Sequence, residues 1–85
     1  MTKHVMLILI GSREEAVENV QKILTAWGCY IRTRLGLHGN INDKCSHKGL
    51  LFLELDGEVD KLKEFEHKLN LIKSVDAQLI ELKTE

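Results

Sequence analysis

Three residues in one polar stretch of the chain carry side chains that commonly bind transition metals: His38, Cys45 and His47. In an extended segment, residues two positions apart point to the same side, so Cys45 and His47 would lie together, and His38 stands at the other end of the stretch. Thiolate and imidazole groups suit nickel, zinc, copper or iron, and a second subunit could supply a fourth ligand. The stretch therefore predicts a transition-metal site. The other interpretation is a polar surface loop in which these residues occur by chance.

A second candidate site is the turn Gly11-Ser12-Arg13. Ser12 is followed three positions later by Glu15, which is the capping-box spacing at the start of a helix. The first N–H groups of a helix have no partner within it, so they can bind a small anion or the carboxylate of a ligand. We predict a small-ligand site at this turn, with Arg13 as a contact. The alternative is an ordinary capped helix, which has the same geometry without a ligand.

Catalysis and nucleic-acid binding have less support. Cys45 beside His47 or His38 is the one pair that resembles a nucleophile and its base, and no oxyanion pocket accompanies it, so we expect no enzyme. Arg32 and Arg34 form a short basic stripe, which keeps direct nucleic-acid binding as an alternative. However, 12 Lys and Arg against 13 Asp and Glu give a net charge of -1. The chain as a whole therefore has no electrostatic attraction to nucleic acid or to anionic membranes.

Two cysteines without a recognisable signal peptide predict a cytoplasmic protein rather than a disulfide framework. Cys29 follows a predicted helix stop, and we interpret it as a small packed residue. His4 and His67 are expected to be solvated. The apolar run 5–10 is too short to span a membrane, so we predict no membrane association.

The spacing of apolar residues predicts the elements that hold these sites. Strands are predicted at residues 4–10, 31–37, 50–56 and 72–82, and helices at 13–27 and 58–69. The first and third strands are apolar on both faces, as central strands are, whereas the second and fourth alternate like edge strands. Gly28 and Asn70 are predicted to stop the helices in the left-handed region.

The order β-α-β-β-α-β predicts an α+β fold, namely a ferredoxin-like two-layer sandwich that forms a single domain over residues 1–85. Its antiparallel sheet of four strands would carry both helices on one face. Each central strand then has a set of alternating apolar residues on the other face of the sheet, which no helix covers. Because an 85-residue chain is only marginally stable alone, we predict a homodimer or homotetramer formed through the sheet, by its face or its edge.

Segments across nearly the whole chain resemble small bacterial proteins described as iron-only hydrogenase system regulators. The resemblance is carried by Arg34-Leu35-Gly36-Leu37-His38, by Cys45-Ser46 and by the run from Gly49 to Gly57. Those proteins are similar to ACT-like regulatory domains and to the C-terminal domain of the nickel-responsive repressor. The resemblance implies a ferredoxin-like fold, assembly through the sheet and a binding site at His38, Cys45 and Gly49. The repressor also has a ribbon-helix-helix segment, for which no residues remain here, so direct DNA binding is not expected.

These observations favour a small non-enzymatic regulatory module that senses a metal ion or a small metabolite as an oligomer and contacts another protein. Two other classes stay open, namely a direct nucleic-acid-binding protein and a structural interaction module without a ligand. Stabilisation by a ligand would support the first class, since binding to the folded state alone raises the melting temperature. Salt-sensitive retention on nucleic acid would support a nucleic-acid-binding protein. The absence of both responses would support a structural interaction module.

Overall fold

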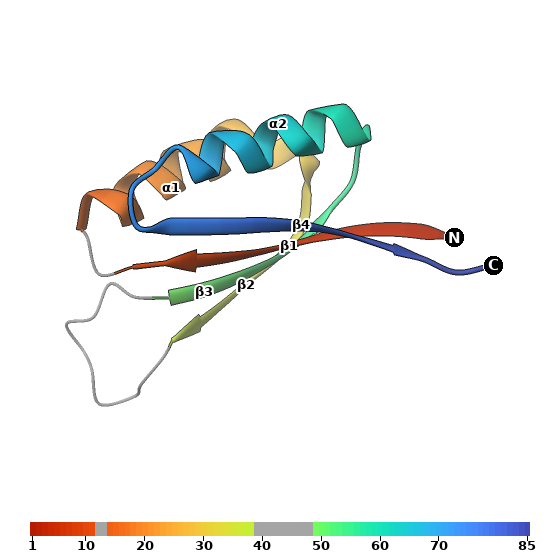
Figure 1. The fold of residues 1–85 in the computed structure, drawn as a ribbon, viewed down its shortest axis with the longest axis horizontal. Coiled ribbons are helices and arrows are strands. Elements are labelled where there is room, and N and C mark those ends of the chain that lie inside the picture. Colours follow the sequence, from red (N-terminus) through yellow and green to blue (C-terminus); the bar gives the residue numbers. More distant parts are fainter. Residues whose placement is uncertain (12–13, 39–48) are drawn as a thin grey trace.

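The computed structural model describes residues 1–11, 14–38 and 49–85. In this part of the chain the strands are β1 (Thr2–Ile10), β2 (Ile31–His38), β3 (Gly49–Leu55) and β4 (Val75–Lys83). The helices are α1 (Glu14–Ala26), α2 (Val59–Asn70) and a short 3₁₀ helix at Gly28–Tyr30. Figure 1 shows α1 and α2 side by side on one face of the sheet. The predicted β-α-β-β-α-β order and the two-layer arrangement are confirmed.

The strands form one antiparallel sheet in the order β2-β3-β1-β4. β1 lies between β3 and β4, with Met6 opposite Leu53 on one side and Leu79 on the other. β2 pairs with β3 and has a bulge between Ile31 and Thr33. The strands that are apolar on both parities are therefore the central ones, as predicted from their hydrophobicity.

The core lies between the sheet and the two helices and contains no buried polar or charged side chain among the described residues. The buried residues are Met6, Ile8, Ile10, Ala16, Val20, Leu24, Leu51, Leu53, Leu55, Leu62, Phe65, Leu69 and Ala77. They recur at every second position in the strands and at three- or four-residue spacing in the helices. Trp27 stacks on Phe65 with 5.3 Å between ring centroids, which closes one end of this layer.

The helices end within one residue of the predicted positions, at Ala26 and Asn70, but the predicted left-handed conformation at Gly28 and Asn70 is wrong. Gly28 does not adopt positive φ; it continues from α1 into the 3₁₀ helix, where the Tyr30 N–H donates to the Trp27 carbonyl at 3.0 Å. The two aromatic rings, 5.3 Å apart, keep this segment wound against the core. Asn70 is the last residue of α2, and Leu71 after it is still in the right-handed region.

The side chain of Asn70 instead joins α2 to β4. Its amide nitrogen donates to the Ala77 carbonyl at 2.9 Å, and its oxygen accepts from the Ala77 N–H at 2.8 Å. The left-handed residue of this connection is Ser74, with φ of 68°. The Gly11 N–H donates to the Ser74 carbonyl at 2.7 Å. These bonds fix the α2–β4 turn to the end of β1.

Gly57 is the glycine among the described residues that has positive φ, at 139°. A Cβ atom at this position would lie 2.6 Å from Cδ1 of Tyr30. The Asp56 N–H also donates to the Tyr30 carbonyl at 2.8 Å. The β3–α2 turn therefore requires glycine for its backbone conformation and for the close approach of Tyr30.

Candidate functional site

The face of the sheet that carries neither α1 nor α2, here called the open face, is largely apolar. The cross-strand register brings Leu7 beside Phe52, and Phe52 in turn beside Leu35. Leu9 is 57% exposed and Leu35 is 53% exposed, although both lie within strands. The apolar residues of the open face are Val5, Leu7, Leu9, Leu35, Leu50, Phe52, Ile80 and Leu82. A contiguous apolar surface of this kind is typical of an interaction site.

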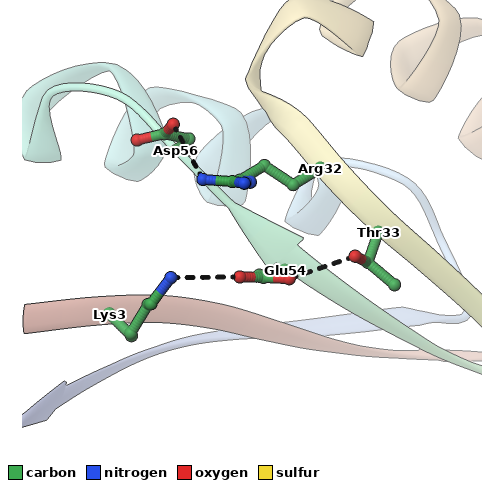
Figure 2. Close-up of polar contacts among 5 residues, drawn as sticks. All are labelled: Lys3, Arg32, Thr33, Glu54 and Asp56. Carbon is green, nitrogen blue, oxygen red and sulfur yellow. Dashed lines mark hydrogen bonds and ion pairs between the residues drawn. The ribbon is translucent and has the colours of Figure 1, made fainter.

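One end of the open face is polar and consists of Lys3, Thr33 and Glu54, here called the polar cluster (Figure 2). The Thr33 hydroxyl donates to Oε1 of Glu54 at 3.0 Å, and Nζ of Lys3 donates to Oε2 at 3.4 Å. These hydrogen bonds, first that of Thr33 and then that of Lys3, hold the pKa of Glu54 below its ordinary value. The carboxylate therefore stays ionised and joins β1, β2 and β3 at this end of the sheet.

A second ion pair lies next to the polar cluster. Nη1 of Arg32 is 3.7 Å from Oδ2 of Asp56 (Figure 2), and both side chains are exposed. A cavity of about 200 Å³ opens beside them and is lined by Thr2, Lys3, His4, Arg32, Leu55, Asp56 and Gly57. The predicted basic stripe is thus partly neutralised, because Arg32 faces Asp56 and Glu54 lies on the neighbouring strand.

The sequence-predicted metal residues are only partly within the described chain. His38 is the last residue of β2, and its backbone pairs with Gly49 of β3. Cys45 and His47 lie outside the described residues. Within residues 1–11, 14–38 and 49–85, no group of three His, Cys, Asp or Glu side chains could hold a metal ion. The site at His38, Cys45 and His47 stays a prediction.

The predicted small-ligand turn is described only at Gly11. Its N–H is already bonded to the Ser74 carbonyl. A Cβ atom here would lie 2.9 Å from Cβ of Ser74, so the two backbones approach closely. Ser12 and Arg13 lie outside the described residues, and ligand binding at this turn stays a prediction that depends on them.

Two of the predictions for isolated residues are wrong. Cys29 is exposed rather than packed, because the 3₁₀ helix directs Trp27 and Tyr30 toward the core instead. His4 is not solvated: its side chain is 12% exposed, and Nε2 lies 3.3 Å from Oε1 of Glu81. The orientation of that pair does not make a hydrogen bond, so the buried Nε2 has no partner. His67 is exposed, as predicted.

Sequence reasoning missed the polar cluster. Lys3, Thr33 and Glu54 are far apart along the chain, and their types alone suggest solvated strand residues. The available signal was cross-strand pairing, which places Thr33 directly opposite Glu54. That pairing depends on the bulge in β2, which shifts the register by one residue and which the alternation of residue types does not reveal.

Solved structures resemble this arrangement. An uncharacterized protein from Thermotoga maritima matches with a TM-score of 0.82 and 23% identity over 98% of this chain and 100% of its own. CPII from Thiomonas intermedia K12, in a structure bound to ADP, AMP and acetate, matches with a TM-score of 0.51 and 12% identity over 99% and 89%. A dimeric ferredoxin-like protein of unknown function from Thermobifida fusca matches with a TM-score of 0.49 and 13% identity over 98% and 92%.

The chain has a ferredoxin-like fold. The strand order β2-β3-β1-β4, with both helices on one face of the sheet (Figure 1), confirms the predicted fold class, and the likeness to the Thermotoga maritima protein agrees with it. No protein-family model matches the chain, and no curated protein matches its sequence. The resemblance to the iron-only hydrogenase system regulators therefore stays a prediction. Neither described α-helix of this ferredoxin-like fold is long and apolar enough to cross a membrane.

Proposed function

We propose that this chain is a non-enzymatic regulatory module that works as a homo-oligomer joined through the open face of its sheet. The observation that carries the proposal is the apolar character of that face, where Leu9 and Leu35 are each more than half exposed. Packing a second copy against it would remove these side chains from water, which contributes about 25 cal/mol per Å² of apolar area. The smallest such assembly is a homodimer, and a second contact would produce a homotetramer.

The same surface on both subunits is what a two-fold dimer needs. In an isologous contact each residue patch meets its own copy, so an apolar patch is complementary to itself without any second surface. Two stacked sheets lie about 10 Å apart with their inner side chains interdigitated. Leu7, Phe52 and Leu35 form a row across three strands and supply such an inner layer. The polar cluster would lie at the rim of this contact, where charged groups can keep their water.

The regulatory part of the proposal rests on the two predicted binding sites. His38, Cys45 and His47 offer imidazole and thiolate ligands for a transition metal, and Gly11, Ser12 and Arg13 offer a turn for a small anionic metabolite. A ligand that binds one oligomeric state better than another shifts the population toward that state. The module would then report the ligand to a partner protein through its assembly state.

Sedimentation velocity on the wild type and on two leucine variants tests the dimer. Leu9→Glu places a charge in the open face, and Leu71→Glu places the same charge at a leucine that is 71% exposed on the helical side. We expect the wild type and Leu71→Glu to sediment as dimers or larger species at micromolar concentration and Leu9→Glu as a folded monomer. A monomeric wild type, or a dimer unaffected by Leu9→Glu, would contradict the proposal.

A thermal-shift screen tests the ligand. Nickel, zinc and iron salts and a panel of small carboxylates should include at least one that raises Tm saturably. A ligand at 100 times its Kd contributes about 2.7 kcal/mol to the folded state. The Cys45→Ser variant should lose a metal response, whereas Cys29→Ser, at an exposed cysteine outside the predicted site, should keep it. Salt-sensitive retention on nucleic acid in place of any such response would favour the alternative class.

A further inference from the structure

A groove runs along the helical layer of the molecule, on the side opposite the open face. It lies between α1, the end of α2 and the turn that leads to β4, and its volume is about 590 Å³. Figure 1 shows the two helices running side by side above the sheet, with the connection to β4 at one end. The groove is lined by Glu15, Ala16, Asn19, Lys22, Ile23, Lys68, Leu71, Ile72 and Lys73. None of these residues belongs to the predicted metal site or to the polar cluster.

One wall of the groove is apolar. Ala16, Ile23, Leu71 and Ile72 supply this wall, and Ala16 is also part of the core. Leu71 is 71% exposed although it directly follows a helix. Glu15 to Ile23 spans about 12 Å of helix, at 1.5 Å per residue. The volume and length match sites that take a small organic molecule, which range over about 300–1,000 Å³.

The polar residues of the groove are mainly cationic. Lys22, Lys68 and Lys73 stand against a single acidic residue, Glu15. Among the described residues, no carboxylate lies within ion-pair distance of these three ammonium groups. The lysines can therefore direct their charge at a ligand, and their methylene chains can cover its apolar part.

Backbone hydrogen bonds hold one wall of the groove in place. The Leu71 N–H donates to the Lys68 carbonyl at 3.3 Å, and the Ile72 N–H donates to the Leu69 carbonyl at 3.1 Å, which continues α2 into the turn. The bond from Gly11 to Ser74 holds the other end of this turn against β1. These bonds give the α2–β4 turn a defined backbone conformation beside α1.

We propose that this groove binds an amphipathic anion, namely a small molecule with an extended apolar chain and one carboxylate or phosphate group. The apolar part would lie along Ile23, Leu71 and Ile72, and the anionic group would be held by the lysines. The proposal goes beyond the proposed function and does not depend on dimerisation, because the groove and the open face are on opposite sides of the sheet.

Titration of the ¹⁵N-labelled protein with decanoate, kept below its micelle concentration, tests the site. We expect saturable amide shifts in residues 15–23 and 68–73, in the wild type and in Leu9→Glu alike. Acetate, which lacks the chain, should produce no saturable shift, and decanol, which lacks the charge, should bind more weakly. Shifts centred on β1 and β3 instead, or no saturation, would overturn the proposal that the groove binds the ligand. The dimer is tested separately, by sedimentation velocity. Equal binding of decanol would overturn the anionic part of the proposal.

Substitutions at the groove separate charge from apolar contact. Lys22→Gln, Lys68→Gln and Lys73→Gln should each weaken decanoate binding about two- to fivefold, the range for exposed ion pairs. The triple variant should weaken it about tenfold or more. Lys63→Gln removes the same charge from an exposed position on α2 outside the groove and should leave the Kd unchanged. Leu71→Ser should weaken decanoate binding at unchanged Tm. Lysine variants that bind like the wild type would overturn the assignment.

Discussion

Glu54 is the residue through which the three strands of the polar cluster are joined. It accepts hydrogen bonds from Thr33 of β2 and Lys3 of β1, and both lower its pKa from the ordinary value of 4.5. Both bonds are stronger when the carboxylate is ionised, so protonation of Glu54 would weaken the network. The side chain is still partly exposed, and solvent screens the contribution of the cluster to stability.

The pH dependence of stability follows from the direction of that shift. Because the pKa of Glu54 is lower in the folded chain than in the unfolded chain, its contribution is complete above the unfolded-state pKa. It is lost as the pH falls through the lowered folded-state pKa. Glu54→Gln should therefore lower Tm at neutral pH. The difference in Tm between this variant and the wild type should become smaller in acid. Glu85→Gln removes the same charge at the exposed chain end and serves as the control. A constant Tm difference across the acid range would contradict the network.

At the scale of elements, the strand order and the extent of the helices were predictable, but the backbone conformation that follows each helix was not. The apolar residues on both parities of β1 and β3 report burial of both faces, which is a property of the strand alone. The end of α1 depends on how Trp27 and Tyr30 pack, and the end of α2 depends on a bond from Asn70 to Ala77. Such contacts join distant parts of the chain, so local propensity at Gly28 and Asn70 was overridden by tertiary structure.

The two glycines at element ends provide a matched prediction. Gly57→Ala should destabilise the fold by about 1–3 kcal/mol, because φ of 139° is costly for alanine and the new Cβ meets Tyr30. Gly28→Ala meets no atom within 4 Å and has no positive φ. It should be neutral or stabilising by about 0.4–1 kcal/mol through the unfolded state. Urea denaturation of both variants measures the contrast, and equal destabilisation would contradict the described turn geometry.

The candidate sites were less predictable than the fold, for the same physical reason. Residue type identifies side chains that can bind a metal, as at His38, Cys45 and His47, but convergence of three side chains depends on backbone geometry. The open face could be inferred from the sequence. Leu7, Leu9 and Phe52 belong to the alternating set of apolar strand residues that no helix remains to cover. The groove between the helices could not, since Lys22, Lys68 and Lys73 are brought together only by the crossing of α1 and α2.

For the whole molecule, the open face links stability to concentration. An 85-residue chain buries only about two-thirds of its unfolded surface, so a second copy on the open face would supply part of the stability. Unfolding would then be coupled to dissociation, and each tenfold rise in protein concentration would favour the folded dimer by about 1.4 kcal/mol per mole of dimer. We expect Tm of the wild type to rise by roughly 3–6 °C per tenfold increase.

Leu35→Glu, a substitution on the edge strand of the open face, should remove this dependence by preventing dimerisation. Val59→Glu is the matched control, because Val59 is an exposed apolar residue of similar size at the start of α2, away from the open face. It should keep the concentration dependence of the wild type. Differential scanning fluorimetry over a hundredfold range of protein concentration measures both variants. A Tm of the wild type that is independent of concentration would mean that the apolar face is tolerated in water by the monomer, and the proposed assembly would have to be abandoned.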